Sequence, residues 1–129
     1  MKSFRVGRIE LIVGPMFAGK TTEMLRRVSR LELAHQKAVV MKYSRDTRYS
    51  ENKVSTHDLT MRPAIPCSTL TPHFDECLQY DVVGIDEGQF FPDIVEFSDK
   101  LANLGKIVIV CGLDGDFLRK PFGNIVNLI

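Results

Sequence analysis

The chain has 129 residues, of which 44% are hydrophobic and 26% are charged. Such a chain is long enough for one domain with a single core, and its composition excludes an intrinsically disordered protein. The 17 lysines and arginines and 16 aspartates and glutamates give a formal net charge of +1, so no nucleic acid is expected as a partner, because no excess of positive charge would attract a polyanion.

The three cysteines are Cys67, Cys77 and Cys111. Their odd number and the lack of a C-x-x-C pair argue against a disulfide framework and a zinc site, and favour reduced, buried thiols. The apolar segment near the N-terminus is too short for a signal peptide, and no apolar run is long enough to span a membrane. We therefore expect a cytoplasmic protein with no membrane partner.

The first predicted element is a strand at residues 9–13, IELIV, whose β-branched residues indicate burial on both faces. From residue 21 to residue 35, apolar side chains recur at helical spacing, which predicts an amphipathic helix. Three of its apolar residues would pack on the sheet and three arginines would point to solvent: Met24, Val28 and Leu31, and Arg26, Arg27 and Arg30.

Later in the chain the same kinds of element recur. Residues 38–43, 81–86 and 106–111 are predicted strands, and residues 92–104 are a predicted helix that Gly105 would end. Strands that are continuously apolar and separated by helices are typical of an α/β fold, with an open, mainly parallel sheet and helices on both faces.

Two segments depart from this pattern. In the polar segment at residues 44–58, apolar residues recur with neither the helical nor the strand period, so the segment is predicted to be a loop. Residues 123–129 have the pattern of the first turns of a helix that is cut short. We therefore expect the 129 residues to form one domain of a longer protein.

The segment GPMFAGKT, residues 14–21, fits the phosphate-loop pattern G-x-x-x-x-G-K-[ST] and lies between a predicted strand and a predicted helix, as that pattern requires. Its amides and the positive end of the helix would hold phosphate. Lys20 would neutralise the β- and γ-phosphates of ATP, and the hydroxyl of Thr21 would bind Mg²⁺. A glycine-rich turn that arose by chance is the alternative. The fold class is therefore that of P-loop NTPases, and the expected ATP-binding residues are Gly14, Pro15, Met16, Phe17, Ala18, Gly19, Lys20, Thr21 and Thr22.

A second Mg²⁺ ligand is expected at the end of a neighbouring apolar strand, and the segment VVGIDE supplies Asp86 there. Glu87, the next residue, would accept a proton from an attacking hydroxyl. An acidic pair after a strand can also be an ordinary helix cap. In combination with the phosphate loop, the pair favours a site for phosphoryl transfer.

Asp46 and Arg48 follow the second strand and are expected at the same carboxyl edge of the sheet. Arg48 would stabilise charge on the moving phosphoryl group, and Asp46 would orient Arg48 or the acceptor hydroxyl. The same triplet, DTR, also fits a solvated turn with an exposed ion pair. Aromatic residues that follow two of the strands would stack on a planar base, although the residues alone favour core positions: these are Phe90, Phe91, Phe117 and Phe122.

Five segments, in their order and spacing, resemble the cytosolic type of thymidine kinase: GPMFAGKTTEMLRRV, KYSRDTRYS, STHD, GIDEGQFFPDIVEF and LDGDFLRKPFG. The resemblance extends over nearly all of residues 8–129, and IDEGQFF and RKPFG are not general phosphate-loop features. It implies a transferase of nucleotide salvage for DNA synthesis, which transfers the γ-phosphate of ATP to the 5′-hydroxyl of thymidine or deoxyuridine and releases ADP.

The resemblance also implies roles for individual residues. Glu87 is the catalytic base, Asp86 helps to place Mg²⁺, and Asp46 and Arg48 face the 5′-hydroxyl and the phosphates. The family forms tetramers. Positions that line the thymine pocket in the family correspond to Met16, Phe90, Leu113, Phe117 and Phe122. The resemblance therefore favours a role in base binding for these phenylalanines, rather than the core positions that the residues alone favour.

Chains of this family continue into a small zinc-bearing domain with a lasso loop that closes over the nucleoside, and nothing in these 129 residues corresponds to it. We therefore expect an ATP-binding kinase domain without its zinc and lasso domain, and zinc only in that missing part. Two other hypotheses stay open. One is a non-catalytic ATP-binding module from a truncated or duplicated nucleoside kinase; the other is an ATP-driven motor or recombinase-like domain, which the near-neutral charge disfavours.

Overall fold

The computed structural model describes residues 6–14, 19–44, 53–55, 61–112 and 126–128. A six-stranded sheet lies at its centre, in the order β5-β2-β6-β7-β1-β8. All the strand pairs of this sheet are parallel. In chain order its strands are β1 (Arg8–Val13), β2 (Ala38–Tyr43), β5 (Ile65–Cys67), β6 (Val82–Asp86), β7 (Ile107–Gly112) and β8 (Val126–Leu128).

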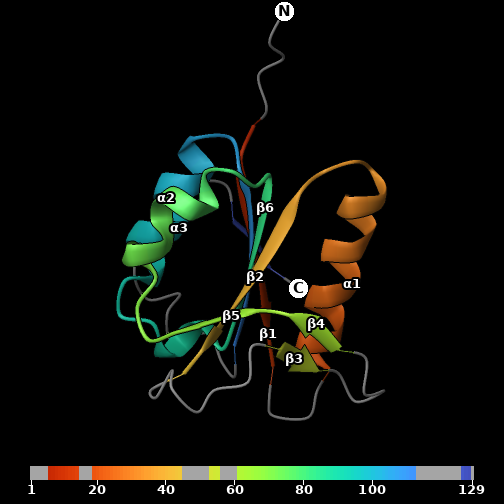
Figure 1. Ribbon diagram of the computed structural model, residues 1–129, viewed down its shortest axis with the longest axis horizontal. Coiled ribbons are helices and arrows are strands. Elements are labelled where there is room, and N and C mark those ends of the chain that lie inside the picture. Colours follow the sequence, from red (N-terminus) through yellow and green to blue (C-terminus); the bar gives the residue numbers. More distant parts are fainter. Residues whose placement is uncertain (1–5, 15–18, 45–52, 56–60, 113–125, 129) are drawn as a thin grey trace, which may run out of the picture.

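Helices cover both faces of this sheet (Figure 1). One face carries α1 (Lys20–Leu33), and the other carries α2 (Phe74–Cys77) and α3 (Ile94–Asn103). The α/β fold with an open, parallel sheet between two helical layers is therefore confirmed. None of the helices that the structure describes is long and apolar enough to cross a membrane.

Two clusters of buried apolar side chains form the core, and the one under α1 follows the predicted amphipathic face. On one side Met24 and Val28 of α1 are buried against the sheet and Leu31 packs partly buried beside them. On the other side Phe97 and Leu101 of α3 are buried. Burial of apolar side chains of this size contributes about 1.5–3 kcal/mol each to folding, so these faces fix the helices on the sheet.

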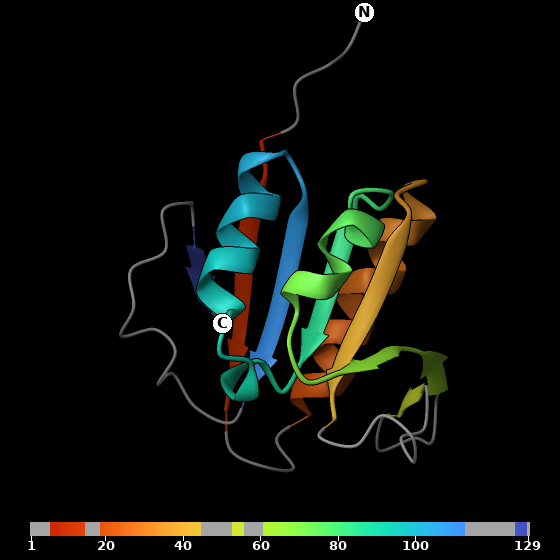
Figure 2. The ribbon, with the colours of Figure 1, turned by 60° about the vertical axis from the view of Figure 1, so that its left-hand side comes forward.

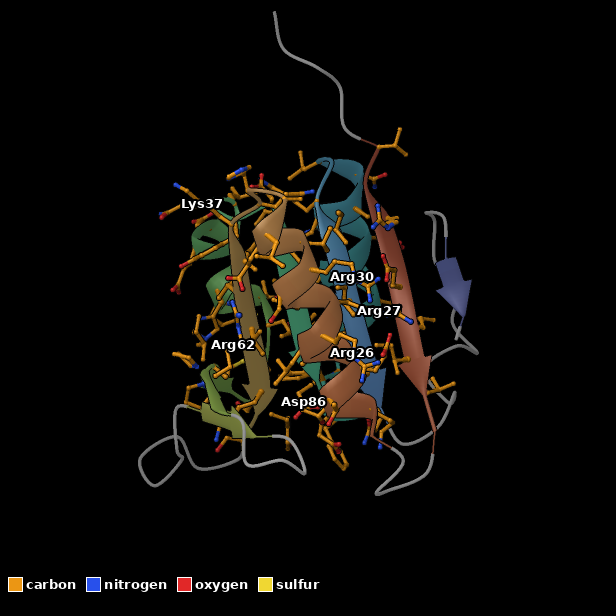
Figure 3. The ribbon with its side chains drawn as sticks, turned by 90° about the vertical axis from the view of Figure 1, so that its right-hand side faces the viewer. Arg26, Arg27, Arg30, Lys37, Arg62 and Asp86 are labelled. Atoms are coloured by element: carbon orange, nitrogen blue, oxygen red, sulfur yellow. The ribbon has the colours of Figure 1, made fainter. Side chains whose placement is uncertain are left out.

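The prediction for Arg27 is wrong, because its side chain is only 12% exposed. Its Nη1 lies 2.7 Å from Oε1 of Glu10 in β1, and its Nε lies 2.8 Å from Oε2 of Glu23 in α1. Glu10 is a charged residue in a strand predicted to be buried on both faces, and it needs a partner of opposite charge when it is partly buried. Arg26, in contrast, is exposed, as predicted; Figure 3 shows both arginines on α1.

Two further segments differ from their predictions. Residues 126–128, within the segment predicted to begin a helix, form strand β8, which pairs with Ile9–Leu11 of β1. Residues 53–55, within the predicted loop, form β3 (Lys53–Ser55), which pairs with the antiparallel strand β4 (Met61–Pro63). Strands β3 and β8 have three residues each, too few to show a repeat of apolar residues. Their extended conformation depends on pairing with a neighbouring strand rather than on their own sequence.

The hairpin β3–β4 is tied to α1. Arg62 of β4 donates two hydrogen bonds of 2.7 Å to the two carboxylate oxygens of Glu32 in α1. The arginine raises the stability of the charged carboxylate, and the pKa of Glu32 is lowered by its hydrogen bond with Arg62. Strand β5, which follows β4, contains Pro66 and lies at the edge of the sheet, where a residue without an N–H group is tolerated.

The carboxyl ends of the parallel strands meet at one edge of the sheet. In Figure 2 the arrowheads of β1, β7 and β6 all point to this edge. Gly14 follows β1 there, Gly112 ends β7, and Asp86 ends β6 with Glu87 next in the chain. Ligands of open α/β sheets bind at this edge, so a ligand-binding site is expected here.

Candidate active site

Helix α1 begins at a glycine cap, directly after the loop that the sequence predicts to bind phosphate. Gly19 is the N-cap and adopts the left-handed conformation with φ 78° and ψ 21°, and Lys20 is the first helical residue. The N–H of Glu23 donates to the carbonyl of Gly19 at 3.0 Å, which closes the first turn. The first N–H groups of a helix and its dipole attract anions. The predicted strand before this segment and the predicted helix after it are confirmed, while residues 15–18 lie outside the described residues.

Thr21 and Asp86 are brought together although 65 positions separate them in the chain. The Thr21 hydroxyl donates to Oδ1 of Asp86 at 3.1 Å. Figure 3 shows Asp86 near the first turn of α1, at the carboxyl end of the strands. A hydroxyl and a carboxylate are hard oxygen donors of the kind that Mg²⁺ takes in phosphoryl-transfer sites. The donor set of these two residues therefore fits the expected metal.

Glu87 holds a backbone conformation that is rare for a residue with a side chain. Its φ is 57° and its ψ is 48°, and it precedes the short 3₁₀ helix η2 (Gly88–Phe90). Its Oε2 accepts a hydrogen bond of 3.0 Å from Nε2 of Gln89. A left-handed conformation is unfavourable for such a residue and persists only where the surroundings impose it, most often at functional sites.

Gly88 shows what imposes this turn. A Cβ atom at this position would lie 2.3 Å from Cγ1 of Val110 in β7, a separation that packed atoms do not reach. The backbone after Glu87 therefore lies directly on β7 and cannot move outward without losing this contact. The catalytic candidate Glu87 is thus attached to the rigid sheet rather than to an independent loop.

Cys111, the penultimate residue of β7, was missed as a site residue in the sequence. It is fully buried, as predicted, but its Sγ lies 3.0 Å from Oδ1 of Asp86. Burial raises the pKa of the Cys111 thiol well above its usual range, and the Asp86 charge raises it further, so the thiol is protonated and acts as the donor. Cys111 ends the predicted strand 106–111, as Asp86 ends the predicted strand 81–86, but that these two strands are neighbours is seen only in the sheet.

The aromatic residues after β6 separate into two groups. Phe90 is 47% exposed at the edge where the strands end, whereas Phe91 is 2% exposed and belongs to the core. The ring of Tyr43, at the end of β2, contacts both: its centroid lies 5.1 Å from that of Phe90 and 5.3 Å from that of Phe91. Tyr43 was not predicted as part of the site.

Several predicted residues lie outside the described residues, and the structure says nothing of them. They are Pro15, Met16, Phe17, Ala18, Asp46, Arg48, Leu113, Phe117 and Phe122. Of the others, the described residues bring together the first turn of α1, with Lys20, Thr21 and Thr22, and the end of β6, with Asp86 and Glu87. Lys20 is buried, with 8% of its surface exposed.

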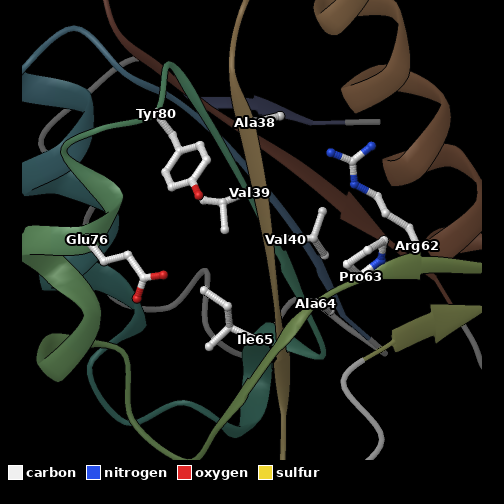
Figure 4. Close-up of a pocket in the computed structure, with 9 residues that line it drawn as sticks. All are labelled: Ala38, Val39, Val40, Arg62, Pro63, Ala64, Ile65, Glu76 and Tyr80. Carbon is white, nitrogen blue, oxygen red and sulfur yellow. The ribbon is translucent and has the colours of Figure 1, made fainter.

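A pocket of about 490 Å³ lies beside the amino-terminal half of β2, away from this edge (Figure 4). It contains none of the predicted site residues, so it is distinct from the candidate site. Its lining residues are Ala38, Val39, Val40, Arg62, Pro63, Ala64, Ile65, Glu76 and Tyr80.

Three features together define a class of protein. They are a parallel sheet, a glycine-capped helix that follows its first strand, and an aspartate at the end of another strand whose side chain contacts that helix. This is the class of nucleotide-binding α/β proteins with a phosphate loop. Comparison with known proteins narrows the class further. The family model described as thymidine kinase matches residues 7–129, and the chain therefore belongs to the thymidine kinase family.

Individual relatives agree with the family model. The chain is 51% identical over 127 residues to thymidine kinase 1 of Dictyostelium discoideum, an alignment that covers 95% of this chain and 56% of the relative. It is 54% identical over 123 residues to the cytosolic thymidine kinase of Homo sapiens, covering 95% and 52%. For the thymidine kinase of Yaba monkey tumor virus the identity is 55% over 125 residues, covering 97% and 68%. The chain thus spans little more than half the length of the first two relatives.

Proposed function

We propose that the protein is an ATP-dependent thymidine kinase, which transfers the γ-phosphate of ATP to the 5′-hydroxyl of thymidine or deoxyuridine. One observation carries the proposal: Thr21 of the phosphate-binding turn meets Asp86 at 3.1 Å, and Glu87 is the next residue in the chain. The names of the relatives support the choice of thymidine as substrate.

The phosphates of ATP would lie on the loop from Gly14 to Thr21 and on the first turn of α1, with Thr22 adjoining them. Lys20 would neutralise the β- and γ-phosphates. Thr21 and Asp86 would hold Mg²⁺, which would offset part of the phosphate charge. Arg48 would stabilise charge on the moving phosphoryl group, and Asp46 would orient Arg48 or the 5′-hydroxyl.

Glu87 is the proposed general base. Its carboxylate takes the proton of the 5′-hydroxyl as the hydroxyl oxygen attacks the γ-phosphorus, the bond to the β-phosphate oxygen breaks, and ADP leaves. The Gln89 amide, 3.0 Å from the Glu87 carboxylate, would keep this carboxylate oriented toward the acceptor. Positioning of both substrates supplies the remainder of the rate enhancement, and no covalent enzyme intermediate is needed.

The thymine base would stack on aromatic side chains at the same edge of the sheet. Phe90 is exposed there, and the centroid of its ring lies 5.1 Å from that of the Tyr43 ring. The other proposed pocket residues are Met16, Leu113, Phe117 and Phe122.

The organisation of the protein belongs to the same proposal. Residues 1–129 would be the ATP-binding kinase domain, and the protein would act in the cytoplasm as a homotetramer. Three of the relatives carry the word cytosolic in their names, which supports the location, and the tetramer is what the family resemblance implies.

The replacement Glu87→Gln tests the proposal, because it keeps the shape of the side chain and removes the base. Formation of dTMP from thymidine and ATP is measured together with the dissociation constant of ATP. We expect kcat to fall about 10²- to 10⁴-fold while ATP affinity stays unchanged. Glu96→Gln, a change at an exposed glutamate of α3, serves as the matched control and should leave kcat unaltered.

Two results would contradict the proposal. Unchanged turnover in Glu87→Gln would remove the base assignment. ATP binding by the wild-type protein without phosphorylation of thymidine or deoxyuridine would favour the non-catalytic ATP-binding module instead.

A further inference from the structure

We propose that Cys111 is a positioning residue for the proposed metal-binding carboxylate: its thiol holds the Asp86 side chain in the orientation in which it faces Thr21 and Mg²⁺. This inference rests on the proposed function, since it concerns the same site. It assigns a role to a residue whose type alone suggests only core packing.

Two donors from different elements converge on one oxygen atom. Oδ1 of Asp86 lies 3.0 Å from Sγ of Cys111 in β7 and 3.1 Å from Oγ1 of Thr21 in α1. The terminal torsion of an aspartate is broad when nothing holds it. With a donor on each side, the carboxylate plane is fixed before any metal binds, so less ordering is left for the binding step.

Cys111 is itself rigid enough to serve as a support. It is fully buried in β7, where it pairs with Ile12 of β1. The register of β6 and β7 pairs Ile85 with Val110, so the next residues along the two strands, Asp86 and Cys111, are neighbours. On its other side the thiol contacts Sδ of Met24 at 3.7 Å. These contacts hold the thiol in one position, between α1 and the Asp86 carboxylate.

An uncharged hydrogen-bond donor such as the Cys111 thiol is suited to orienting a carboxylate that binds a metal ion. A thiol is a weak, uncharged donor. A lysine or arginine in this position would orient the carboxylate as well, but its positive charge would repel Mg²⁺ and cancel the charge that attracts it. A neutral donor keeps the full negative charge of Asp86 available for the cation.

The other buried cysteines do not share this arrangement. The Sγ of Cys77 lies 3.8 Å from Sδ of Met41 in the opposite core, the same kind of sulfur contact that Cys111 makes with Met24. No carboxylate contact accompanies it among the hydrogen bonds of the described residues. Cys77 therefore provides a control with the same residue type, the same burial and no link to the site.

The test compares Cys111→Ala, Cys111→Ser and Cys77→Ala with the wild type. Mn²⁺ binding in the presence of a non-hydrolysable ATP analogue is titrated by electron paramagnetic resonance, which needs no turnover. We expect Cys111→Ala to weaken Mn²⁺ binding about three- to tenfold, which corresponds to the loss of one neutral hydrogen bond to the Asp86 carboxylate. Cys111→Ser, which restores a donor, should stay within about twofold of the wild type, and so should Cys77→Ala.

The half-saturating Mg²⁺ concentration for dTMP formation is the second readout, and it should rise in Cys111→Ala more than kcat falls. Circular dichroism checks the fold. If Cys111→Ala unfolds, Cys111→Val, which fills the space without a donor, takes its place and should weaken Mn²⁺ binding to the same degree.

The proposal is overturned if the variants without a donor bind Mn²⁺ like Cys77→Ala, if Cys111→Ser binds it as weakly as they do, or if the wild type binds no Mn²⁺ with the nucleotide. Failure of the proposed function looks different. In that case no variant forms dTMP, but the Mn²⁺ titration still separates Cys111→Ala from the wild type.

Discussion

Two residues with side chains adopt positive φ in the part of the chain that the structure describes, His35 at 67° and Glu87 at 57°. For Glu87 the unusual conformation places a carboxylate at the end of β6, beside Asp86, where the proposed chemistry needs it. A feature of this kind at a candidate site supports a functional role, because selection for stability alone would favour glycine there.

His35 adopts its conformation to end α1. The N–H of His35 donates to the carbonyl of Glu32 at 3.0 Å, and the N–H of Gln36 donates to that of Leu31 at 3.1 Å, which together form a Schellman motif. At the end of α3 the same pair of bonds runs from Gly105 to Ala102 and from Lys106 to Leu101. The two helix ends therefore differ in having a histidine or a glycine at the left-handed position.

We predict that His35→Gly stabilises the protein by about 1 kcal/mol, because it removes the steric penalty of a side chain at positive φ. The opposite kind of change at the end of α3, Gly105→Ala, puts a side chain at positive φ and should lower the free energy of unfolding by at least about 1 kcal/mol. Both are measured by urea unfolding at equilibrium. A His35→Gly protein that is less stable than the wild type would show that the imidazole makes a contact that outweighs the strain.

At the scale of elements, the short helical segment before β6 depends on a residue from elsewhere in the chain. The 3₁₀ helix η1 (Thr71–His73) and α2 contain three and four residues, too few to be stable alone. The carboxylate of Asp93, just before α3, accepts hydrogen bonds from the N–H groups of Leu70 and Thr71 at 3.0 and 2.7 Å and from the Thr71 hydroxyl at 2.6 Å. Asp93 thus caps a helix to which it does not belong.

This cap gives a testable pH dependence. Partial burial raises the pKa of Asp93, but the hydrogen bonds from Thr71 and Leu70 outweigh it and bring the pKa below the ordinary value of 3.8. Because the folded pKa is the lower one, the stabilisation is complete above pH 3.8 and is lost as the pH falls through the folded pKa.

We predict that Asp93→Ala lowers the free energy of unfolding by about 1–2 kcal/mol near neutral pH, and that the difference from the wild type shrinks as the pH falls below 3.8. Urea unfolding at a series of pH values measures both effects. Glu96→Ala, at an exposed position in the first turn of α3, should change stability by less than about 0.5 kcal/mol. A difference for Asp93→Ala that stays constant down to the lowest pH would contradict the capping role.

At the scale of the whole molecule, the elements predicted correctly are those with a long apolar pattern. Strands β1, β2, β6 and β7 and helices α1 and α3 were predicted close to their bounds, since burial in a sheet or against it leaves a period that the sequence shows. The turn at Gly19 that begins α1 was predicted because the phosphate-loop pattern is specific and its neighbours are a strand and a helix; that it binds phosphate stays a prediction.

What could not be predicted depends on distant parts of the chain. Strand β8 exists because β1 has a free edge for it, and nothing within residues 126–128 tells a strand from a helix. The Arg27 side chain is largely covered because Glu10 lies across from it in β1. The contact of Cys111 with Asp86 follows from the register of β6 and β7. Each of these features is a property of strand pairing, which a single sequence does not display.

The proposed function depends above all on Glu87 acting on the 5′-hydroxyl of a nucleoside whose phosphate donor lies on the turn before α1. A crystal structure of the protein with thymidine and a non-hydrolysable ATP analogue tests it most directly. We expect the Glu87 carboxylate within about 2.6–3.2 Å of the 5′-hydroxyl oxygen, with the γ-phosphate on the amides that lead into Lys20 and Thr21. A Glu87 carboxylate that points away from the nucleoside, with both ligands in place, would contradict it.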